Sequence, residues 1–523
     1  MKPLSTPARL ACLLLALGTC LTCAADAATA ELPLGRKGLT QTSRTERVAP
    51  GVELEHVRRG GHAPRAHWLL MSGVVRGEAE LGRQRSCFTG LGLRAQVDTF
   101  RIAGESAEPY QVLQGGKFSS RDGALRAARA AARDGCRLHA RHSSEDAGNA
   151  DGPWDIRIAT IAPGATLVAQ AGDNARQLRT PTSVLARRAG AALAVNGGFF
   201  VEHAEDGFPG QPAGLSILAG QLNSTPVARR PAVIVTGDAR RPILLTDDLD
   251  WQATLVWSNG ERIAVDGVNR QPGLVRNCGR RTGEAPIHDY TCHYQDDLVY
   301  FPPHGPFTAM RLTGDRFALD PAGHARRLGA DEAAASDESV LVVTPGSDRI
   351  KRIEACIAAG ATAVFDSALS AGGAGLHPSF AVNAGPTLLR SGAEIRRDAA
   401  EGWAMEAVPD DAAHRLLMHE WINRRNPRTA IGIKQDGTVL LVTVDGHDHR
   451  RSVGLTIEEL RKLMKALGAR DALNLDGGGS TALVVNGRLV NLPSDATGER
   501  AVGDALAVLT ASHPRVSGDA SKK

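Results

Sequence analysis

Apolar and polar positions alternate in several short stretches of this chain, and a period of two is typical of half-buried strands. The alternation is clear at 50–57, which reads Pro-Gly-Val-Glu-Leu-Glu-His-Val. The following segments predict strand, helix, strand, strand, helix and strand at 67–75, 77–85, 93–102, 110–118, 119–134 and 137–141. Ser120 or Asp122 is the expected cap of the second helix. This βαββαβ order predicts a small ferredoxin-like module.

A longer domain follows, in which Gly/Pro turns separate many strands and helices are few. The clearest helical patterns are 183–188, 348–359 and 456–467. Because strands and helices do not alternate regularly, the pattern predicts an α+β domain with a large mixed sheet rather than a barrel of repeated units. The strand at 50–57 is expected to belong to this large domain.

The N-terminal end differs in composition from the interior. Residues 1–30 begin with Lys2 and Arg9, continue through an apolar run and end in small residues, which predicts an export signal peptide. Later apolar runs fall short of the ~20 residues that a spanning helix needs. We expect an exported protein, periplasmic or extracellular or held at the cell envelope. Lipoprotein anchoring at Cys20 or Cys23 is less favoured, because threonine precedes both cysteines.

Composition divides the rest of the chain. The predicted parts are a lead segment with the first strand of the large domain at 31–64, the module at 65–142, a polar linker at 143–153, the large domain at 154–512 and a disordered tail at 513–523. A hydrophobic fraction of 42% supports a full core, and a formal charge of +4 gives no sign of a nucleic-acid or membrane partner.

Five cysteines follow the signal region, so at least one is expected to stay unpaired. Cys278 and Cys292 bracket a short polar loop and are expected to form a disulfide. Cys87 and Cys136 each follow one of two helices that run antiparallel in the predicted topology. We therefore expect them at opposite ends of the sheet and unpaired. Cys356 lies on an apolar helix face and is expected to be buried.

The most informative stretch is 472–483, where an apolar run enters three consecutive glycines. This predicts a buried strand that ends in a turn with uncovered backbone. The N–H groups of such a turn can form an anion-binding concavity, with hydroxyl donors and a carboxylate at its rim. The residues expected there are Asn474, Asp476, Gly477, Gly478, Gly479, Ser480 and Thr481. A tight turn in which Asp476 is only a turn former is the alternative.

Five motifs occur in order at 194–200, 428–433, 442–446, 474–481 and 498–502. They read Ala-Val-Asn-Gly-Gly-Phe-Phe, Arg-Thr-Ala-Ile-Gly-Ile, Val-Thr-Val-Asp-Gly, Asn-Leu-Asp-Gly-Gly-Gly-Ser-Thr and Gly-Glu-Arg-Ala-Val. With them the chain resembles the phosphodiester glycosidases, the family of the lysosomal uncovering enzyme, which removes N-acetylglucosamine from a sugar phosphodiester. The resemblance covers roughly 154–510 and implies a hydrolase of glycosidic phosphodiesters.

This chemistry and the family motifs imply roles for particular residues. Loss of a phosphate from an anomeric carbon needs anion stabilisation and a carboxylate that activates water or attacks directly. Asp476 and Asp445 are the expected carboxylates, Arg428 the catalytic anion partner and Arg500 a phosphate ligand. Further substrate contacts are expected from Asn196, Gly197, Asp266 and Asn269. A surface ion pair is the alternative for either arginine, and a strand-end turn former for Asp445.

His447 and His449 follow Asp445 closely, which raises the possibility of a divalent metal. Spacing of one residue in a loop suits a shared metal site poorly, so we expect a solvated polar turn, no metal site and no cofactor. Many family members carry arginine where His447 stands, so the pocket is expected to differ here.

Residues 110–118, followed by Ala124, Ala127, Ala128 and Gly135, resemble a sporulation-related repeat (SPOR) module. The resemblance implies binding to peptidoglycan glycan strands, and the alternative is an insertion that only packs on the enzyme. The expected partners are therefore peptidoglycan and a carbohydrate or sugar-phosphate polymer substrate, without nucleic acid. Two other functions stay open: a glycosidase acting on non-phosphorylated glycans, and a non-catalytic glycan-binding envelope protein.

Overall fold

The structure is a computed structural model that describes residues 30–62, 65–102, 104–105, 109–146, 151–172, 179–236, 243–281, 283–305, 312–409 and 411–509. The chain divides into two compact units, 1–31 and 32–523, and the elements below belong to the second. The predicted signal peptide up to residue 29 and the predicted C-terminal tail lie outside the described residues. Within the described ranges, no helix is long and apolar enough to cross a membrane.

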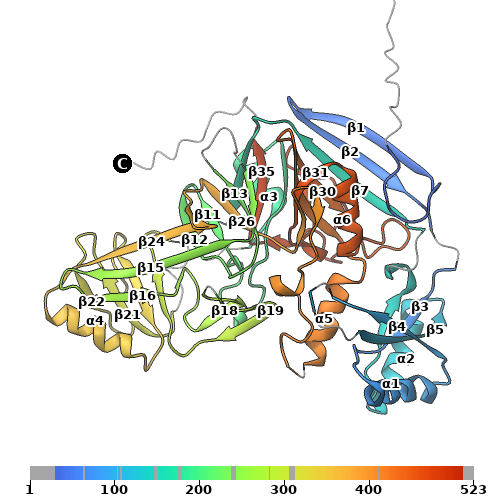
Figure 1. Cartoon of the computed structure of the whole chain (residues 1–523), viewed down its shortest axis with the longest axis horizontal. Helices are drawn as coiled ribbons and strands as arrows, with labels where there is room; N and C mark the ends of the chain where they lie inside the picture. The colour runs from blue at the N-terminus through green and yellow to red at the C-terminus, as the bar shows by residue number, and fades with distance from the viewer. Residues whose placement is uncertain are drawn as a thin grey trace, which may run out of the picture. The chain divides into compact units, whose positions relative to one another are not determined.

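An eight-stranded antiparallel sheet runs through the large domain (Figure 1). Its strands, in spatial order, are β1 (Gln41–Ala49), β2 (Val52–Arg59), β7 (Trp154–Ile161), β30 (Val439–Val444), β29 (Arg428–Lys434), β31 (Ala469–Asn474), β27 (Thr387–Arg390) and β28 (Ala393–Glu394). β2 contains most of the strand predicted at 50–57 and pairs with β7, so the chain returns to the same sheet after the module.

The central strands are buried on both faces because their apolar residues alternate between two cores. In β30, Leu440 and Val442 join one hydrophobic cluster, whereas Val439 and Leu441 join the other. α6 (Ile457–Ala466) covers the first face and begins with a capping box, in which Thr456 and Glu459 each bond the other's backbone N–H.

Two five-stranded sheets pack on the second face. The first contains β33 (Arg488–Leu489), β32 (Leu483–Val485), β10 (Leu193–Asn196), β35 (Asp504–Leu509) and β8 (Thr166–Ala171). The second contains β12 (Gln221–Ser224), β11 (Ser216–Leu218), β26 (Phe380–Asn383), β13 (Ala232–Val235) and β14 (Ile243–Thr246). α3 (Thr182–Ala189) packs on β10 and β35, and the short β9 (Thr180–Pro181) pairs with β34 (Ala501–Val502).

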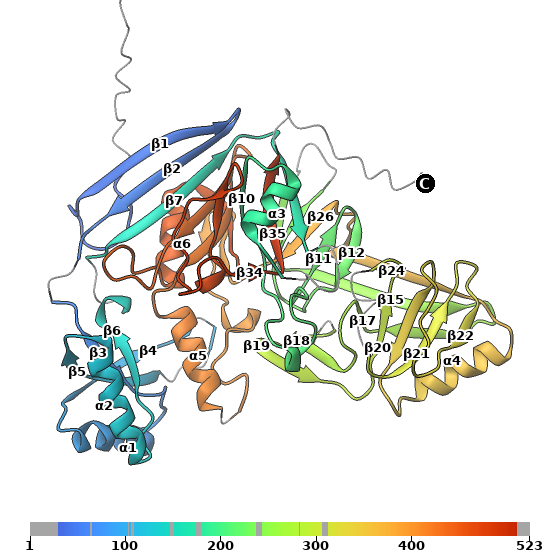
Figure 2. The same ribbon diagram turned by 180° about the vertical axis from the view of Figure 1, so that it is seen from behind.

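A further part of the large domain lies around α4 (Asp348–Ala358), as both Figure 1 and Figure 2 show. One sheet contains β16 (Arg262–Val265), β15 (Leu249–Trp257), β24 (Ala363–Ala371) and β25 (Ala374–Gly375). The other contains β17 (Gly267–Val268), β20 (Leu298–Phe301), β23 (Ser339–Val343), β21 (Asp315–Leu319) and β22 (Ala325–Arg327). The parallel pair β17–β20 makes this second sheet mixed, so the predicted mixed sheet occurs here, while the large sheet is antiparallel.

The cysteines of this part behave as predicted. The Cys278–Cys292 disulfide is confirmed and joins β18 (Leu274–Cys278) to β19 (Pro286–His293). Cys356 is a free thiol buried in the core beneath α4.

The module has the predicted order of elements. They are β3 (Trp68–Met71), α1 (Glu78–Gly90), β4 (Ala95–Phe100), β5 (Tyr110–Phe118), α2 (Arg121–Arg133) and β6 (His139–His142). The strands form an antiparallel sheet in the order β4-β5-β3-β6, and both helices pack on one face of it. Ser120 caps α2 by accepting the N–H of Gly123 at 3.2 Å.

Cys87 and Cys136 form a second disulfide, so the prediction that they stay unpaired is wrong. That prediction placed each cysteine at the far end of an ideal antiparallel helix pair. In the structure the chain turns back directly after α2, where Gly135 has a left-handed φ of 76° and the Cys136 N–H donates to Ala131 O. Both cysteines then pack on the same apolar cluster beneath the helices.

α5 (Ala412–Ile422) lies beside the module in both views, and the sequence patterns did not predict it (Figures 1 and 2). Met418 and Ile422 of α5 share one hydrophobic cluster with Leu69, Met71 and Val112 of the module sheet. On this face of its sheet, the module therefore shares a hydrophobic core with α5. Ion pairs Arg141–Glu420, Arg424–Glu145 and Arg424–Asp146 surround the shared cluster.

Candidate active site

The turn after β31 lies where three strand ends meet. Asn196 at the end of β10 donates its side-chain amide to Asp476 O at 2.7 Å. The Asp476 N–H donates to Gly197 O at 3.1 Å, and the Gly197 N–H donates to Asp504 O at 3.0 Å. These bonds bring segments that are far apart in the sequence to one edge of the stacked sheets.

Asp476 is half-buried at this edge. Its Oδ1 accepts the N–H of Gly477 at 2.8 Å. Burial raises the pKa of Asp476 to about 6, while the Ser480 hydroxyl and the Arg500 charge oppose this rise. The carboxyl group can therefore change its protonation state close to neutral pH.

Asp504 is a second acid at this edge, and the sequence reasoning missed it. Its Oδ1 accepts the N–H of Gly198 at 2.8 Å, and its buried Oδ2 has no hydrogen-bond partner among the described residues. Burial, together with the negative charge of Asp476, raises the pKa of Asp504 to about 7. The charge of Asp476 is therefore one cause of the raised pKa of Asp504.

Gly197 is needed for this arrangement, because a side chain there would collide with the Asp504 carboxylate. A signal for Asp504 existed in the sequence. It follows the 498–502 motif by two residues and opens the apolar strand β35, which mirrors the position of Asp476 after β31.

Arg500 brings a positive charge to the acid pair. Its guanidinium donates to both oxygens of Asp495, at 2.8 and 3.0 Å, and lies 3.7 Å from Glu202. The side chain is 32% exposed, so an anionic ligand can reach it from solvent. Any side chain at Gly479 would collide with Arg500 and Asp495, which explains the glycine there.

Comparison with known proteins places this geometry in a family. Residues 325–509 match the family described as phosphodiester glycosidase (NAGPA). A putative exported protein from Burkholderia pseudomallei K96243 is 30% identical in a structure match that covers 92% of this chain and 98% of that one, with a TM-score of 0.78. This chain belongs to the same family as the Burkholderia protein. Its residues 325–509 form a phosphodiester glycosidase domain.

Other relatives share shorter segments. The SPbeta prophage-derived uncharacterized protein YomE of Bacillus subtilis (strain 168) is 40% identical over 103 residues, which is 19% of this chain and 16% of that protein. The mouse N-acetylglucosamine-1-phosphodiester alpha-N-acetylglucosaminidase is 37% identical over 76 residues, 14% of each chain. The match therefore spans less than a fifth of either relative. A hypothetical protein from Synechocystis, 16% identical with a TM-score of 0.50, shares the fold.

In the glycine turn of the phosphodiester glycosidase domain, most backbone N–H groups have partners within the protein. The Gly478 N–H donates to Pro427 O at 3.0 Å, and the Ser480 and Thr481 N–H groups donate to Gly477 O and Gly478 O. The turn tightens into a 3-10 turn, Gly478–Ser480, in which Gly478 has a left-handed φ of 57°. The N–H groups of Gly477, Gly478, Ser480 and Thr481 are therefore used within the protein, and the anion-binding role of the turn stays a prediction.

The two predicted asparagines of this edge are fully buried. Asn474 donates its side-chain amide to Gly385 O at 2.8 Å and joins β31 to the segment before β27. Asn196 accepts the hydroxyl of Thr429 at 2.6 Å while donating to Asp476 O. Thr481 is also buried, with 2% exposure. These contacts position the turn, and a contact of these residues with substrate stays a prediction.

Arg428 was predicted to bind phosphate, but the structure gives its guanidinium other partners. It is buried and donates to the carbonyl oxygens of Leu455 at 2.8 Å and Trp421, and its charge lies 4.7 Å from the centre of the Trp421 ring. Burial lowers its pKa to about 9. Arg428 therefore holds the end of α5 against the large sheet, and the phosphate role is not supported.

Asp445 is adjacent to the turn but already has partners. It accepts the Leu492 N–H at 3.1 Å, pairs with Arg157 at 3.2 Å and accepts the Asn491 amide, which also donates to Thr481 O. Burial raises its pKa, and the Arg157 charge opposes this rise. Asp445 therefore supports the turn through Asn491.

The two histidines after Asp445 lie in different surroundings. His447 contacts Asn426 at 3.1 Å, and the His449 ring stacks on His142 with centroids 4.1 Å apart. Across the described ranges, no group of three or more His, Cys, Asp or Glu residues is arranged to hold a metal ion.

Asp266 and Asn269 lie in the part of the domain around β17. Asp266 is buried, accepts the Leu298 N–H at 3.0 Å and pairs with Arg349 and Arg281. Asn269 donates to Asn223 O at 3.3 Å. The contacts described for both residues do not include the glycine turn.

Proposed function

We propose that the protein hydrolyses the bond between the anomeric carbon and the phosphate oxygen of a sugar phosphodiester. The observation that carries this proposal is the presence of two acids, Asp476 and Asp504, with pKa values raised to about 6 and about 7, together with the solvent-accessible guanidinium of Arg500. Strongly perturbed acids next to a cationic group are typical of hydrolytic sites.

In this reaction the bond between carbon and oxygen breaks, a phosphate monoester leaves, and water supplies the new hydroxyl group. Asp476, ionised above pH 6, either takes the proton from water or attacks the anomeric carbon. Arg500 stabilises the charge on the leaving phosphate, for which its bond to Asp495 is exchanged. Asp504 is a positioning residue: it is buried, fixes the Gly198 backbone and holds a proton next to Asp476.

The test is hydrolysis of a panel of nucleotide sugars by the purified protein without added metal. Asp476→Asn is expected to lower turnover by about a thousandfold, because the amide keeps the shape but cannot accept a proton. Asp436→Asn is the matched control, since Asp436 is an exposed acid in the turn between β29 and β30.

Three outcomes contradict the proposal. Unchanged turnover in Asp476→Asn removes this residue from the mechanism. Background hydrolysis across the whole panel, together with tight glycan binding, favours the non-catalytic glycan-binding alternative. Background hydrolysis of the panel, together with hydrolysis of oligosaccharides that contain no phosphate, favours an ordinary glycosidase.

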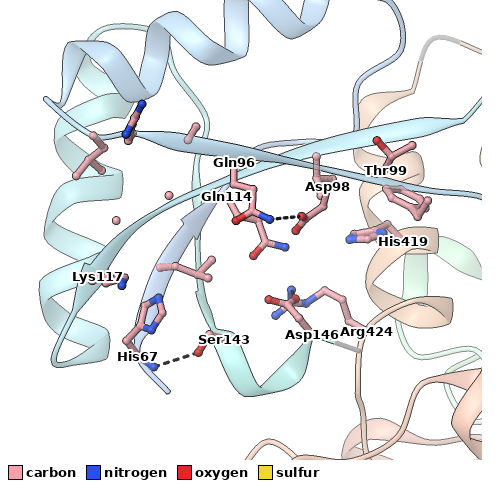
Figure 3. A pocket seen from close by; sticks show the side chains of 18 of the residues that line it. His67, Gln96, Asp98, Thr99, Gln114, Lys117, Ser143, Asp146, His419 and Arg424 are labelled. Atoms are coloured by element: carbon pink, nitrogen blue, oxygen red, sulfur yellow. Dashed lines mark hydrogen bonds and ion pairs between the residues drawn. The ribbon is translucent and has the colours of Figure 1, made fainter. Parts of the chain in front are cut away.

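We also propose that the β3–β6 module is a ferredoxin-like, SPOR-like unit that binds peptidoglycan glycan strands. A groove of about 1090 Å³ lies between its sheet and the end of α5 (Figure 3). Gln96, Asp98 and Gln114 line one wall, and His419 and Arg424 line the other. His419 is buried, and neither ring nitrogen has a hydrogen-bond partner among the described residues. Amide and carboxylate groups of this kind match sugar hydroxyl and acetamido groups.

The proposed place of action is the cell envelope or the space outside the cell. Two disulfides are typical of an oxidising compartment, and the Burkholderia relative is described as a putative exported protein. In this proposal the module holds the enzyme on the polymer whose sugar-phosphate bonds the Asp476 site cleaves.

A further inference from the structure

A second cavity has a volume of about 720 Å³, and its lining includes Gly503, the residue before Asp504. Gly210 also lines it, and the Gly210 N–H donates to Val201 O at 2.7 Å. The next residue after Val201 is Glu202, which faces Arg500 at 3.7 Å. One loop therefore contributes both to the acid site and to the wall of this cavity.

The cavity wall is polar but not charged. Among its described lining residues there is no Asp, Glu, Lys or Arg, although these types make up 23% of the chain. Its polar side chains are the amides and hydroxyls of Gln221, Asn223, Asn269, Tyr300 and Ser367, and the imidazole of His304. Amides and hydroxyls suit a neutral ligand with hydroxyl groups.

Two stacked aromatic rings form one side of the cavity. Tyr300 on β20 and Phe365 on β24 have ring centroids 3.9 Å apart and planes 1° from parallel. The Tyr300 hydroxyl is hydrogen-bonded to Ser339 Oγ at 2.7 Å, which fixes the ring. The electron-rich faces of aromatic rings attract C–H groups, as on the apolar face of a sugar. Only 4% of this chain is aromatic, so a stacked pair on a cavity wall is a specific feature.

Asn269 adds an acceptor to the same wall. Its backbone has a left-handed φ of 54°, and its side chain is 2% exposed. The amide nitrogen donates to Asn223 O, whereas the buried Oδ1 has no hydrogen-bond partner among the described residues. An acceptor left without a partner in a strained position indicates a ligand contact.

We infer that this cavity, the aromatic pocket, binds a neutral sugar ring of a glycan, on the side of the site reached past Gly503. Stacking on the aromatic pair holds the ring, and the amides of the wall bond its hydroxyl groups. The inference rests on the proposed function and deepens it. The sugar bound here is a part of the substrate that lies away from the phosphodiester bond.

The test measures binding without turnover, in the Asp476→Asn background of the full chain. The probes are three neutral tetrasaccharides, maltotetraose, cellotetraose and chitotetraose, titrated by calorimetry. At least one is expected to bind. Ser367→Trp should weaken that binding by about tenfold or more, because Ser367 is exposed, lines the pocket and shares the strand face of Phe365.

Ala368→Trp is the matched control, since Ala368 is the exposed neighbour on the opposite strand face. It should bind like the parent. Phe365→Leu, which keeps an apolar group but removes the ring, should also weaken binding several-fold. The melting temperature of each variant shows that it is folded.

The inference is overturned if no tetrasaccharide binds at millimolar concentration, or if Ser367→Trp and Ala368→Trp bind equally. These outcomes are separate from failure of the proposed function. Tetrasaccharide binding that Ser367→Trp weakens and Ala368→Trp does not weaken supports the pocket, even where no nucleotide sugar is hydrolysed. Hydrolysis without tetrasaccharide binding supports the proposed function and overturns the pocket.

Discussion

Asp476 and Asp504 differ in how readily the sequence alone could identify them as site residues. Asp476 could be found because three glycines follow it, and such a turn is rare outside close backbone approaches. The signal for Asp504 is weaker, because no run of glycines follows it and only its place after the 498–502 motif marks it. Its proximity to Asp476 depends on the pairing of β35 with β10, residues that are distant in the sequence. Burial, which sets its pKa, is likewise a property of the folded chain.

Asp504→Asn is expected to change how stability depends on pH. The folded-state pKa of Asp504 is about 7, against about 3.9 for an unfolded chain. Between these values the folded protein holds a proton that the unfolded chain releases, so stability falls as pH rises from 4 to 7 and is level above. Three pH units correspond to about 4 kcal/mol for this group. Urea unfolding at pH 4.5 and pH 8 should show a smaller decline in the variant.

The comparison with the parent protein removes the contribution of the buried Glu401, whose pKa is raised to about 7 in both proteins. An equal decline in parent and variant would show that Asp504 is ionised in the folded state at neutral pH.

At the scale of elements, the periodicity of apolar residues predicted helices and strands that are buried mainly on one side. The strand expected at 110–118 coincides with β5, and the helix expected at 119–134 contains α2. α5 was missed because its apolar residues are buried by partners on more than one side, so no clean amphipathic stripe exists. The partners of Arg428 could not be predicted for a related reason: it donates to the carbonyl oxygen of Trp421 near the C-terminus of α5, a helix that the sequence did not predict.

The Cys87–Cys136 disulfide is expected to stabilise the module by constraining the unfolded chain. It closes a separation of 49 residues, for which loop entropy gives about 4 kcal/mol. The double variant Cys87→Ala, Cys136→Ala should lower the urea midpoint accordingly. The double variant Cys278→Ala, Cys292→Ala is the comparison, since its separation is 14 and the same relation gives about 3 kcal/mol. A larger loss from the shorter loop would contradict the entropic account.

At the scale of the whole molecule, the module is an insertion between two neighbouring strands. β2 and β7 pair along their full length. The chain leaves the sheet after β2, forms the module and returns to the sheet at β7. Its sheet shares a hydrophobic cluster with α5 and with β7. Binding by the module should therefore be measured in the full chain.

The full chain is expected to sediment with purified sacculi, and more strongly after the stem peptides are removed. Gln96→Trp should weaken this binding by roughly tenfold, because Gln96 is exposed and lines the groove of Figure 3. Ser86→Trp, an equally exposed change on α1, is the control. Equal amounts of parent protein in the pellet with and without sacculi would reduce the module to a packing role.

The insertion also separates the synthesis of β2 from that of its partner strand β7. His56 on β2 and Asp155 on β7 are hydrogen-bonded at 2.8 Å, yet the ribosome adds them 99 residues apart. Until β7 has been made, the inner edge of the β1–β2 hairpin has no strand to pair with, and such an edge can recruit another chain. The module is synthesised during that interval, so this edge stays unpaired until the whole insertion has been made. The outer edge is protected differently: β1 carries Arg44, Glu46 and Arg47, charges that discourage a further strand from adding there.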